Sequence, residues 1–181
     1  MKSIIRDLLT TAVMAVVIFL ILQVTVQVSV INGYSMEPNL HNGQRVVVSK
    51  VTYFFHQPER GDIIVFHPPA NWNVVYIKRV IGLPGDTVEI RSGKVYINDN
   101  AQPLDEPYQL PASYSLSKTE VPADNYFVLG DNRDNSNDSH NGWMVPRQNI
   151  IGEAWLSIWP PQVWGLVPNY SFDEQMAGAY S

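Results

Sequence analysis

The 181-residue chain contains no cysteine, which excludes disulfides, thiolate nucleophiles and cysteine zinc sites. It also has few charges, since only 16% of its residues are Asp, Glu, Lys or Arg, and its formal net charge is −5. Nucleic-acid-binding proteins usually carry a basic patch or stripe, so this balance argues against a nucleic-acid partner. The composition, 45% hydrophobic and 11% aromatic, is that of one globular domain with an appendage.

The longest stretch without charge lies near the N-terminus, between Asp7 and Glu37. Residues 4–24 are long and apolar enough to cross a hydrocarbon core of about 30 Å as a helix. A cleaved signal peptide would show a shorter apolar core and a small-x-small cleavage site, whereas bulky residues follow here. We therefore expect an uncleaved anchor with a short stub over residues 1–24 and a separate domain over residues 25–181.

The basic residues predict how this anchor is oriented. Lys2 and Arg6 precede the apolar segment, and no other Lys or Arg occurs before Arg45. The positive-inside rule then predicts a single-pass membrane protein with a cytoplasmic N-terminus and an extracytoplasmic domain. Three tryptophans could reach the lipid headgroups or belong to the core or tail: Trp72, Trp159 and Trp164.

The remaining sequence is typical of short β-strands. Valines alternate from residue 24 to residue 30, which predicts a half-buried strand over 23–31, although the helix could run one turn further before this strand starts. Apolar runs bounded by Gly, Pro and Asp predict further strands within 43–51, 61–68, 73–82, 126–131 and 150–159, and residues 86–99 read as a hairpin. We expect a long loop over 99–124 and no amphipathic helix. The fold class is mainly β, a compact antiparallel barrel or sandwich after one transmembrane helix.

One lysine stands on a face that is otherwise apolar. With period two, Lys78 shares its side of the strand with Val74, Tyr76 and Val80. Taken alone, such a lysine would extend its amine to solvent. A buried amine has a lowered pKa instead, and a shift from about 10.4 to about 7.5 costs on the order of 4 kcal/mol. Such a lysine could act as a base.

Two other segments contain groups that could react with this amine. Ser35 lies in "NGYSMEPNL", an irregular stretch that could fix the direction of a hydroxyl, although most turn serines are only structural. The segment "GDNRDNSNDSH", residues 130–140, could be a simple Asx-rich loop. A calcium loop is disfavoured there because Ser139 occupies the expected glycine position and no glutamate closes the loop.

Three of these segments together resemble a known family. "GYSMEPNL", "YIKRVIGLPGD" and "GDNRDNSNDSH" are similar, in this order, to the three signature segments of type I signal peptidases. The single anchor fits the bacterial members, which implies the inner or plasma membrane or an internal bacterial membrane. The resemblance extends from Ile4 to about Trp159. It implies a membrane-anchored serine endopeptidase that removes signal peptides from exported precursor proteins. Cleavage would follow small residues, through an acyl-enzyme formed by a Ser/Lys dyad.

The resemblance also assigns roles to individual residues. It implies that Ser35 is the nucleophile, Lys78 the general base and Ser136 the hydroxyl that orients the lysine amine. It also implies that Arg79 and Asp131 form a buried ion pair and that Asp138 is a structural acid. Gly33, Met36 and Pro38 belong to the nucleophile segment, in which Met36 and Pro38 shape the pocket.

Two positions depart from the family pattern. Gly33 stands where many members carry a hydroxyl that donates to the oxyanion, so the second oxyanion donor must come from elsewhere, and one such donor is worth roughly 3 kcal/mol. His140 stands where an arginine is common. The partner of Asp138 then titrates, and we expect this loop to loosen as pH rises.

The sequence alone is compatible with other functions. A Ser/His/Asp triad would draw on His41, His56, His67 or His140, none of which lies in a recognisable triad motif. No two histidines have metal-ligand spacing, and we predict no metal and no cofactor. The alternative from another class is a membrane-tethered β-module that binds peptides without cutting. The expected partners are precursor proteins, bound as an added strand, and membrane lipid, and the expected state is a monomer.

Overall fold

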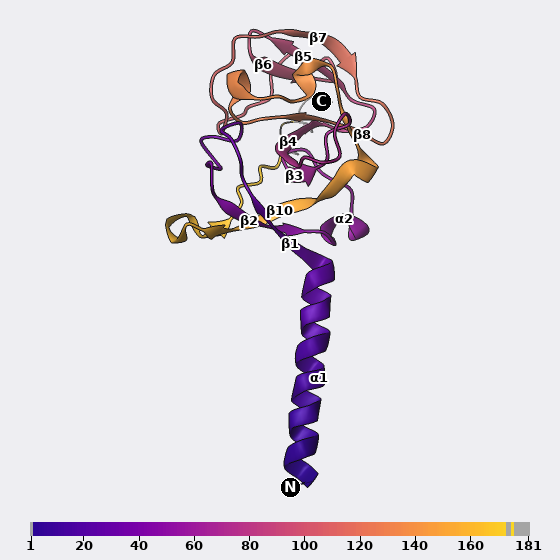
Figure 1. Ribbon diagram of the computed structural model, residues 1–181. Coiled ribbons are helices and arrows are strands. Elements are labelled where there is room, and N and C mark those ends of the chain that lie inside the picture. Colours follow the sequence, from indigo (N-terminus) through magenta and orange to yellow (C-terminus); the bar gives the residue numbers. More distant parts are fainter. Residues whose placement is uncertain (1, 173–174, 176–181) are drawn as a thin grey trace.

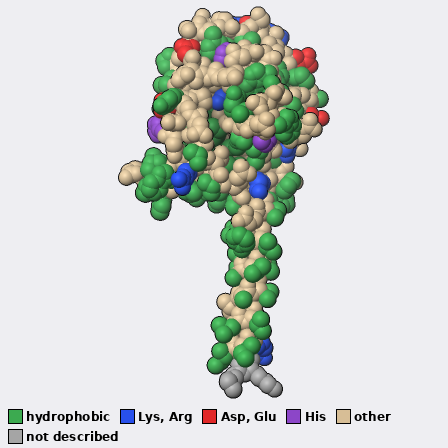
Figure 2. Space-filling model, in the orientation of Figure 1, with side chains coloured by type: hydrophobic (Ala, Val, Ile, Leu, Met, Phe, Trp, Pro, Cys, Tyr) green, Lys and Arg blue, Asp and Glu red, His purple; other side chains and the backbone are tan. Residues whose placement is uncertain are grey.

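The computed structural model describes residues 2–172 and Gln175, and the apolar N-terminal segment forms a single long helix. Helix α1 (Lys2–Thr25) stands away from the rest of the protein like a stalk (Figure 1). Hydrophobic side chains cover its visible surface (Figure 2). Residues Ile4–Thr25 have a mean hydropathy of 2.4 and are long enough to cross a membrane. The helix ends one residue beyond the predicted boundary.

The domain above α1 is built from antiparallel strands in two sheets (Figure 1), which confirms the mainly β prediction. The larger sheet has the order β1-β2-β10-β3-β4-β8-β9, and β11 pairs with β10. Its strands are β1 (Val26–Val30), β2 (Arg45–Ser49), β3 (Ile63–Phe66), β4 (Tyr76–Gly82), β8 (Asn125–Leu129), β9 (Val145–Pro146), β10 (Ile150–Trp159) and β11 (Gly165–Leu166).

The smaller sheet has three strands in the order β6-β5-β7. These are β5 (Thr87–Arg91), β6 (Lys94–Ile97) and β7 (Leu116–Glu120). The connections contain one short α-helix and four 3₁₀ turns: α2 (Thr52–Phe55), η1 (Arg133–Asn135), η2 (Ser139–Asn141), η3 (Arg147–Asn149) and η4 (Pro161–Val163).

The central strand β3 is buried on both faces, which explains its unbroken apolar run. Ile63 and Val65 point into one hydrophobic cluster, while Ile64 and Phe66 point into another on the opposite face. Successive side chains of a strand alternate between faces, so a strand covered on both sides must be apolar throughout.

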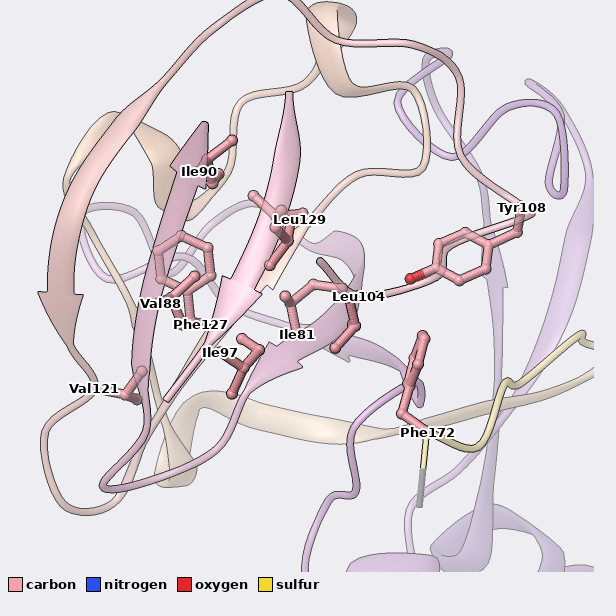
Figure 3. Close-up of a cluster of buried hydrophobic side chains, with 11 residues drawn as sticks. Ile81, Val88, Ile90, Ile97, Leu104, Tyr108, Val121, Phe127, Leu129 and Phe172 are labelled. Atoms are coloured by element: carbon pink, nitrogen blue, oxygen red, sulfur yellow. The ribbon is translucent and has the colours of Figure 1, made fainter. Parts of the chain in front are cut away.

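The predicted hairpin is β5–β6, whose register pairs Val88 with Ile97 and Ile90 with Val95. These side chains pack against residues of β4 and β8 in a third cluster, in which Phe127 is fully buried (Figure 3). This cluster joins the smaller sheet to the larger one.

Two local predictions were wrong, and one short helix was not predicted. The expected loop over 99–124 contains β7, an edge strand that pairs only with β5. Its sequence is mostly polar and shows no apolar alternation, so the pattern did not predict a strand. The strand expected over 23–31 begins only at Val26, because α1 continues to Thr25, and two of its valines are about half exposed: Val28 and Val30. Helix α2 was not expected, since four residues are too few for a periodic pattern.

Removing a ring from the third cluster tests how the two sheets hold together. We expect Phe127→Ala to lower the free energy of unfolding by about 3–5 kcal/mol, because the transfer term and the cavity term add. The matched control is Phe55→Ala, since Phe55 is 86% exposed and Phe127 is 0% exposed. Urea denaturation followed by tryptophan fluorescence measures both, and equal losses would contradict the assignment of Phe127 to the core.

Candidate active site

Lys78 and Ser35 meet inside the domain. The Lys78 Nζ donates a hydrogen bond to Ser35 Oγ at 2.7 Å and a second to the Ile77 carbonyl at 2.9 Å. Lys78 lies on β4, paired with Ile64 of β3, and only 4% of it is exposed. The amine is therefore almost entirely buried, and its apolar strand face directs it to the serine.

Burial changes the acidity of this amine. Removal from water disfavours the ammonium form and lowers the pKa of Lys78 from its ordinary 10.5 to about 8. The negative charges of Asp138 and Asp131 oppose this effect. At such a pKa, a useful fraction of the amine is neutral near physiological pH and can accept a proton.

The turn that carries Ser35 is held at two points. Met36 is 1% exposed and packs in the same cluster as Ile63 and Val65, which anchors the turn from below. Asn132 fixes it from the side, since its backbone N–H donates to the Ser35 carbonyl at 3.0 Å and its Nδ2 to the Tyr34 carbonyl at 3.1 Å. Asn132 was not predicted, because nothing in the neighbouring sequence marks it as a partner of residue 35.

Ser136 lies close to this turn, but its predicted bond is not formed. Its Oγ is buried and has no hydrogen-bond partner among the described residues. A Cβ added at Gly130 would lie 2.3 Å from Ser136 Oγ and 2.5 Å from the Ser35 carbonyl oxygen. Only glycine therefore lets the two segments approach each other here. The orienting role of Ser136 stays a prediction.

Arg79 and Asp131 form a fully buried, bidentate ion pair next to the dyad. The Nε and Nη2 of Arg79 donate to the two carboxylate oxygens of Asp131 at 2.9 and 2.8 Å. The remaining Nη1 donates to the carbonyls of Gly61 and Pro168, and Tyr108 lies 4.2 Å from the guanidinium. This pair fixes the start of the loop after β8, to which the turn of Ser35 is bonded.

Asp138 is also buried, and His140 is its partner. Asp138 accepts from the Gly130 backbone N–H at 2.9 Å, and its other oxygen lies 2.6 Å from His140 Nδ1. The imidazole stacks on Tyr114 with ring centroids 4.3 Å apart. His140 is thus the partner of the buried Asp138 carboxylate, and the two form an ion pair only when the imidazole is protonated. Loosening of the loop at high pH stays a prediction.

A second buried ion pair was not foreseen. Arg133 and Glu106 form a bidentate contact, and the Tyr108 hydroxyl donates to the same carboxylate at 2.8 Å. Arg133 Nε also donates to the Gly130 carbonyl at 3.0 Å. Glu106 lies in the segment expected to be a structureless loop, so no sequence signal joined it to Arg133.

A cleft of about 270 Å³ opens in front of the dyad. Gly33 lines it, whereas Met36 lies beneath it in the core and Pro38 is exposed outside it. Its walls come from the end of β1, the start of β4 and the loop after β8: residues 29–35, 75–78, Asn135 and Asn137. The cleft thus has extended chain on two sides and polar loop residues on the third.

The alternative chemistries find no matching geometry in the described part of the chain. No group of three or more His, Asp and Glu in residues 2–172 could hold a metal ion. The ring hydrogen bonds of His56 and His67 go to backbone carbonyls, and that of His140 goes to Asp138. His41 lies 3.7 Å from Glu37. The hydrogen bond to Ser35 Oγ comes from an amine instead.

The ion pair beside the dyad gives a stability test. We expect Asp131→Asn to lower the free energy of unfolding by about 3–5 kcal/mol, because it leaves the buried Arg79 charge uncompensated. Asp99→Asn is the control, since Asp99 pairs with Lys118 on the exposed surface, where solvent screens the charge, and its loss should change little. Denaturant titration of both variants provides the comparison, and a loss at Asp131 no larger than at Asp99 would contradict the burial argument.

Comparisons with known proteins find a family and several relatives to which this chain is similar. Residues 4–159 match the family described as signal peptidase, peptidase S26. A probable signal peptidase I-1 of Synechocystis is 49% identical over 146 residues, which cover 76% of this chain and 74% of that protein. A signal peptidase I of Leptolyngbya laminosa is 52% identical, covering 70% of this chain and 65% of that protein. A signal peptidase IB of Staphylococcus aureus is 35% identical, covering 88% and 91%.

Among solved structures, a signal peptidase I from Enterococcus faecalis is 35% identical, with a TM-score of 0.45, and the match covers 54% of this chain and 96% of that chain. The family match extends over far more than half of the chain, from the membrane helix to the end of β10. The chain therefore belongs to the S26 family of signal peptidases.

Proposed function

We propose that the protein cuts signal peptides from exported precursor proteins by acyl transfer, with Ser35 as nucleophile and Lys78 as general base. The observation that carries this proposal is the 2.7 Å contact between a buried amine and a serine hydroxyl at the wall of an open cleft. The lowered pKa of Lys78, about 8, supports the role of a base. Membership of the signal peptidase family supports the substrate class.

The chemistry proceeds in two stages. Neutral Lys78 takes the proton from Ser35 Oγ as the oxygen attacks the scissile carbonyl carbon, and the resulting ammonium protonates the departing amine. This leaves an ester on Ser35. Lys78, neutral again, then takes a proton from water as the water attacks the ester. It returns this proton to Ser35 Oγ as the ester bond breaks, which releases the carboxylic acid product and restores Ser35.

The developing oxyanion needs hydrogen-bond donors in fixed positions. We assign the Ser35 backbone N–H as the first donor, because no acceptor engages it in the described part of the chain. The Gly33 N–H is not free for this role, since it donates to Asn42 Oδ1 at 2.9 Å. The second donor must come from another group facing the cleft.

Ser136 has a place in this scheme. Its Oγ is buried and has no partner among the described residues. Both this oxygen and the Ser35 carbonyl oxygen lie close to Gly130. A buried hydroxyl without a partner is costly. We propose that it bonds the Lys78 amine during turnover, when the amine releases Ser35 Oγ.

The cleft suggests how the substrate binds. Extended chain on two sides, from the end of β1 and the start of β4, offers backbone groups to a peptide added as a strand. The small volume, about 270 Å³, favours small side chains next to the cut. Both dyad residues come from one chain, so we propose that the monomer is active.

The anchor places this cleft near its substrates. Lys2 and Arg6 at the N-terminus support a cytoplasmic N-terminus and an extracytoplasmic domain. Trp159 and Trp164 are 51% and 68% exposed, and the arm that carries Trp164 projects sideways near the upper end of α1 (Figure 1). This position supports contact of the arm with lipid, where amphipathic rings collect.

Replacing the dyad residues tests the chemistry. We expect Ser35→Ala and Lys78→Arg each to reduce kcat for a tagged precursor in detergent by at least about a thousandfold, because one lacks the nucleophile and the other cannot lose its proton. Ser117→Ala and Lys94→Gln are the matched controls on the exposed surface and should keep the parental rate. Activity in Lys78→Arg would contradict the dyad, and a parent that binds the precursor without cutting would favour a binding module.

The pKa of Lys78 sets the pH dependence. Because only the neutral amine accepts a proton, kcat/KM should rise about tenfold per pH unit below pH 8 and level off above it. A depressed lysine pKa gives this sign, since the inactive ammonium form dominates at lower pH. Initial rates from pH 6 to pH 10 measure it. A profile that falls as pH rises through 8 would contradict the role of Lys78.

A further inference from the structure

A second hollow, of about 270 Å³, lies where α1 meets the domain. It is separate from the catalytic cleft and shares no residue with it. Its lining combines two cations with apolar and aromatic side chains: Val24, Lys50, Tyr53, Phe54, Arg147, Ile150 and Ile151.

Lys50 presents its ammonium at the end of the helix. The Nζ donates to the Gln23 carbonyl at 3.0 Å, and the Lys50 backbone N–H donates to the Thr25 carbonyl at 2.9 Å. An ammonium has three N–H donors, so two remain for another acceptor. Figure 2 shows basic side chains on the domain just above the top of α1.

Arg147 is held by neutral partners. Its Nη2 donates to the Tyr53 carbonyl at 2.6 Å, its Nε to Gln57 Oε1 at 3.2 Å, and the guanidinium lies 5.6 Å from the Tyr53 ring centroid. These contacts fix the side chain without neutralising it, and Nη1 keeps its donors.

The acids near this hollow are engaged elsewhere. Asp62 accepts from the Tyr53 hydroxyl at 2.9 Å, and Glu153 accepts from Asn169 Nδ2 at 2.6 Å. Within the described residues, no carboxylate lies within 4.0 Å of the Lys50 amine or the Arg147 guanidinium. Two positive charges thus share a hollow without an anionic partner.

The position of the hollow indicates what kind of anion fits. Val24, in the last turn of the membrane-spanning helix, lies in its wall, so the hollow stands at the level of the lipid headgroups. Phe54 and Phe55 of α2 are 78% and 86% exposed, and α2 lies beside the upper end of α1 (Figure 1). Exposed aromatic rings next to a basic hollow suit an amphiphile with an anionic head.

We propose that this hollow binds the headgroup of an anionic lipid, with Lys50 and Arg147 at the lipid's anionic group and Phe54 beside its acyl chains. The bound lipid would join the end of α1 to α2 and fix the angle at which the domain stands on the membrane. This site does not depend on the chemistry proposed for Ser35 and Lys78, and binding is measured without turnover.

The test uses the full chain in detergent micelles with equal amounts of phosphatidylglycerol and phosphatidylcholine, and native mass spectrometry counts the lipids retained. We expect the parent to retain phosphatidylglycerol in preference to phosphatidylcholine. Lys50→Gln should weaken phosphatidylglycerol binding about fivefold, the effect of one basic residue near an anionic surface. Lys94→Gln, on β6 at the end of the domain away from α1, should bind like the parent.

Three results would overturn the proposal. One is a parent that retains both lipids equally. Another is a Lys50→Gln protein that binds like Lys94→Gln while circular dichroism shows both folded; if Lys50→Gln does not fold, Arg147→Gln takes its place with the same expected loss. The third is displacement of the lipid by millimolar inorganic phosphate, which would indicate a site for free anions.

Discussion

The structure depends on keeping one lysine amine out of water beside a serine hydroxyl. Lowering the pKa of Lys78 from 10.5 to about 8 corresponds to roughly 3 kcal/mol of lost stability at neutral pH, because the unfolded chain binds that proton more tightly. The rest of the fold must offset this cost. Hydrophobic clusters on both faces of the larger sheet do so, and they also form the walls that keep water from the amine.

Polar contacts around Lys78 and Ser35 hold the serine in position next to the buried amine. Lys78 is on a central strand, while Ser35 is on a turn that has no regular structure of its own. The turn is fixed by Met36 below it and by Asn132 beside it. Asn132 is itself held because the neighbouring Asp131 and Arg133 each form a buried ion pair. Buried ion pairs give little net stability, but they specify one arrangement, which here is the approach of two segments that lie 95 residues apart or more.

The anchor and the domain meet at a junction with its own chemistry. Lys50 bonds the last carbonyls of α1, and α2 exposes two phenylalanines beside them. The precursors of a signal peptidase are also held by the membrane. The height and tilt of the domain above the membrane therefore determine which peptide bond reaches Ser35. The positive charge of Lys50, which bonds the helix end, is therefore well placed to bind a membrane lipid for that purpose.

The sequence by itself determined the long apolar helix, most strands, the β5–β6 hairpin and the two residues, Ser35 and Lys78, whose side chains meet in the structure. These follow from local periodicity or from contiguous motifs, which a linear chain displays directly. Tertiary structure alone decided that β7 forms in a polar segment, that Glu106 meets Arg133, that Asn132 holds the turn of Ser35, and that Pro38 lies outside the cleft. Each of these depends on a contact between residues distant in sequence or on what covers a given face. The spacing of neighbouring residues predicts neither the distant contacts nor which faces are covered, because both arise only when the chain packs.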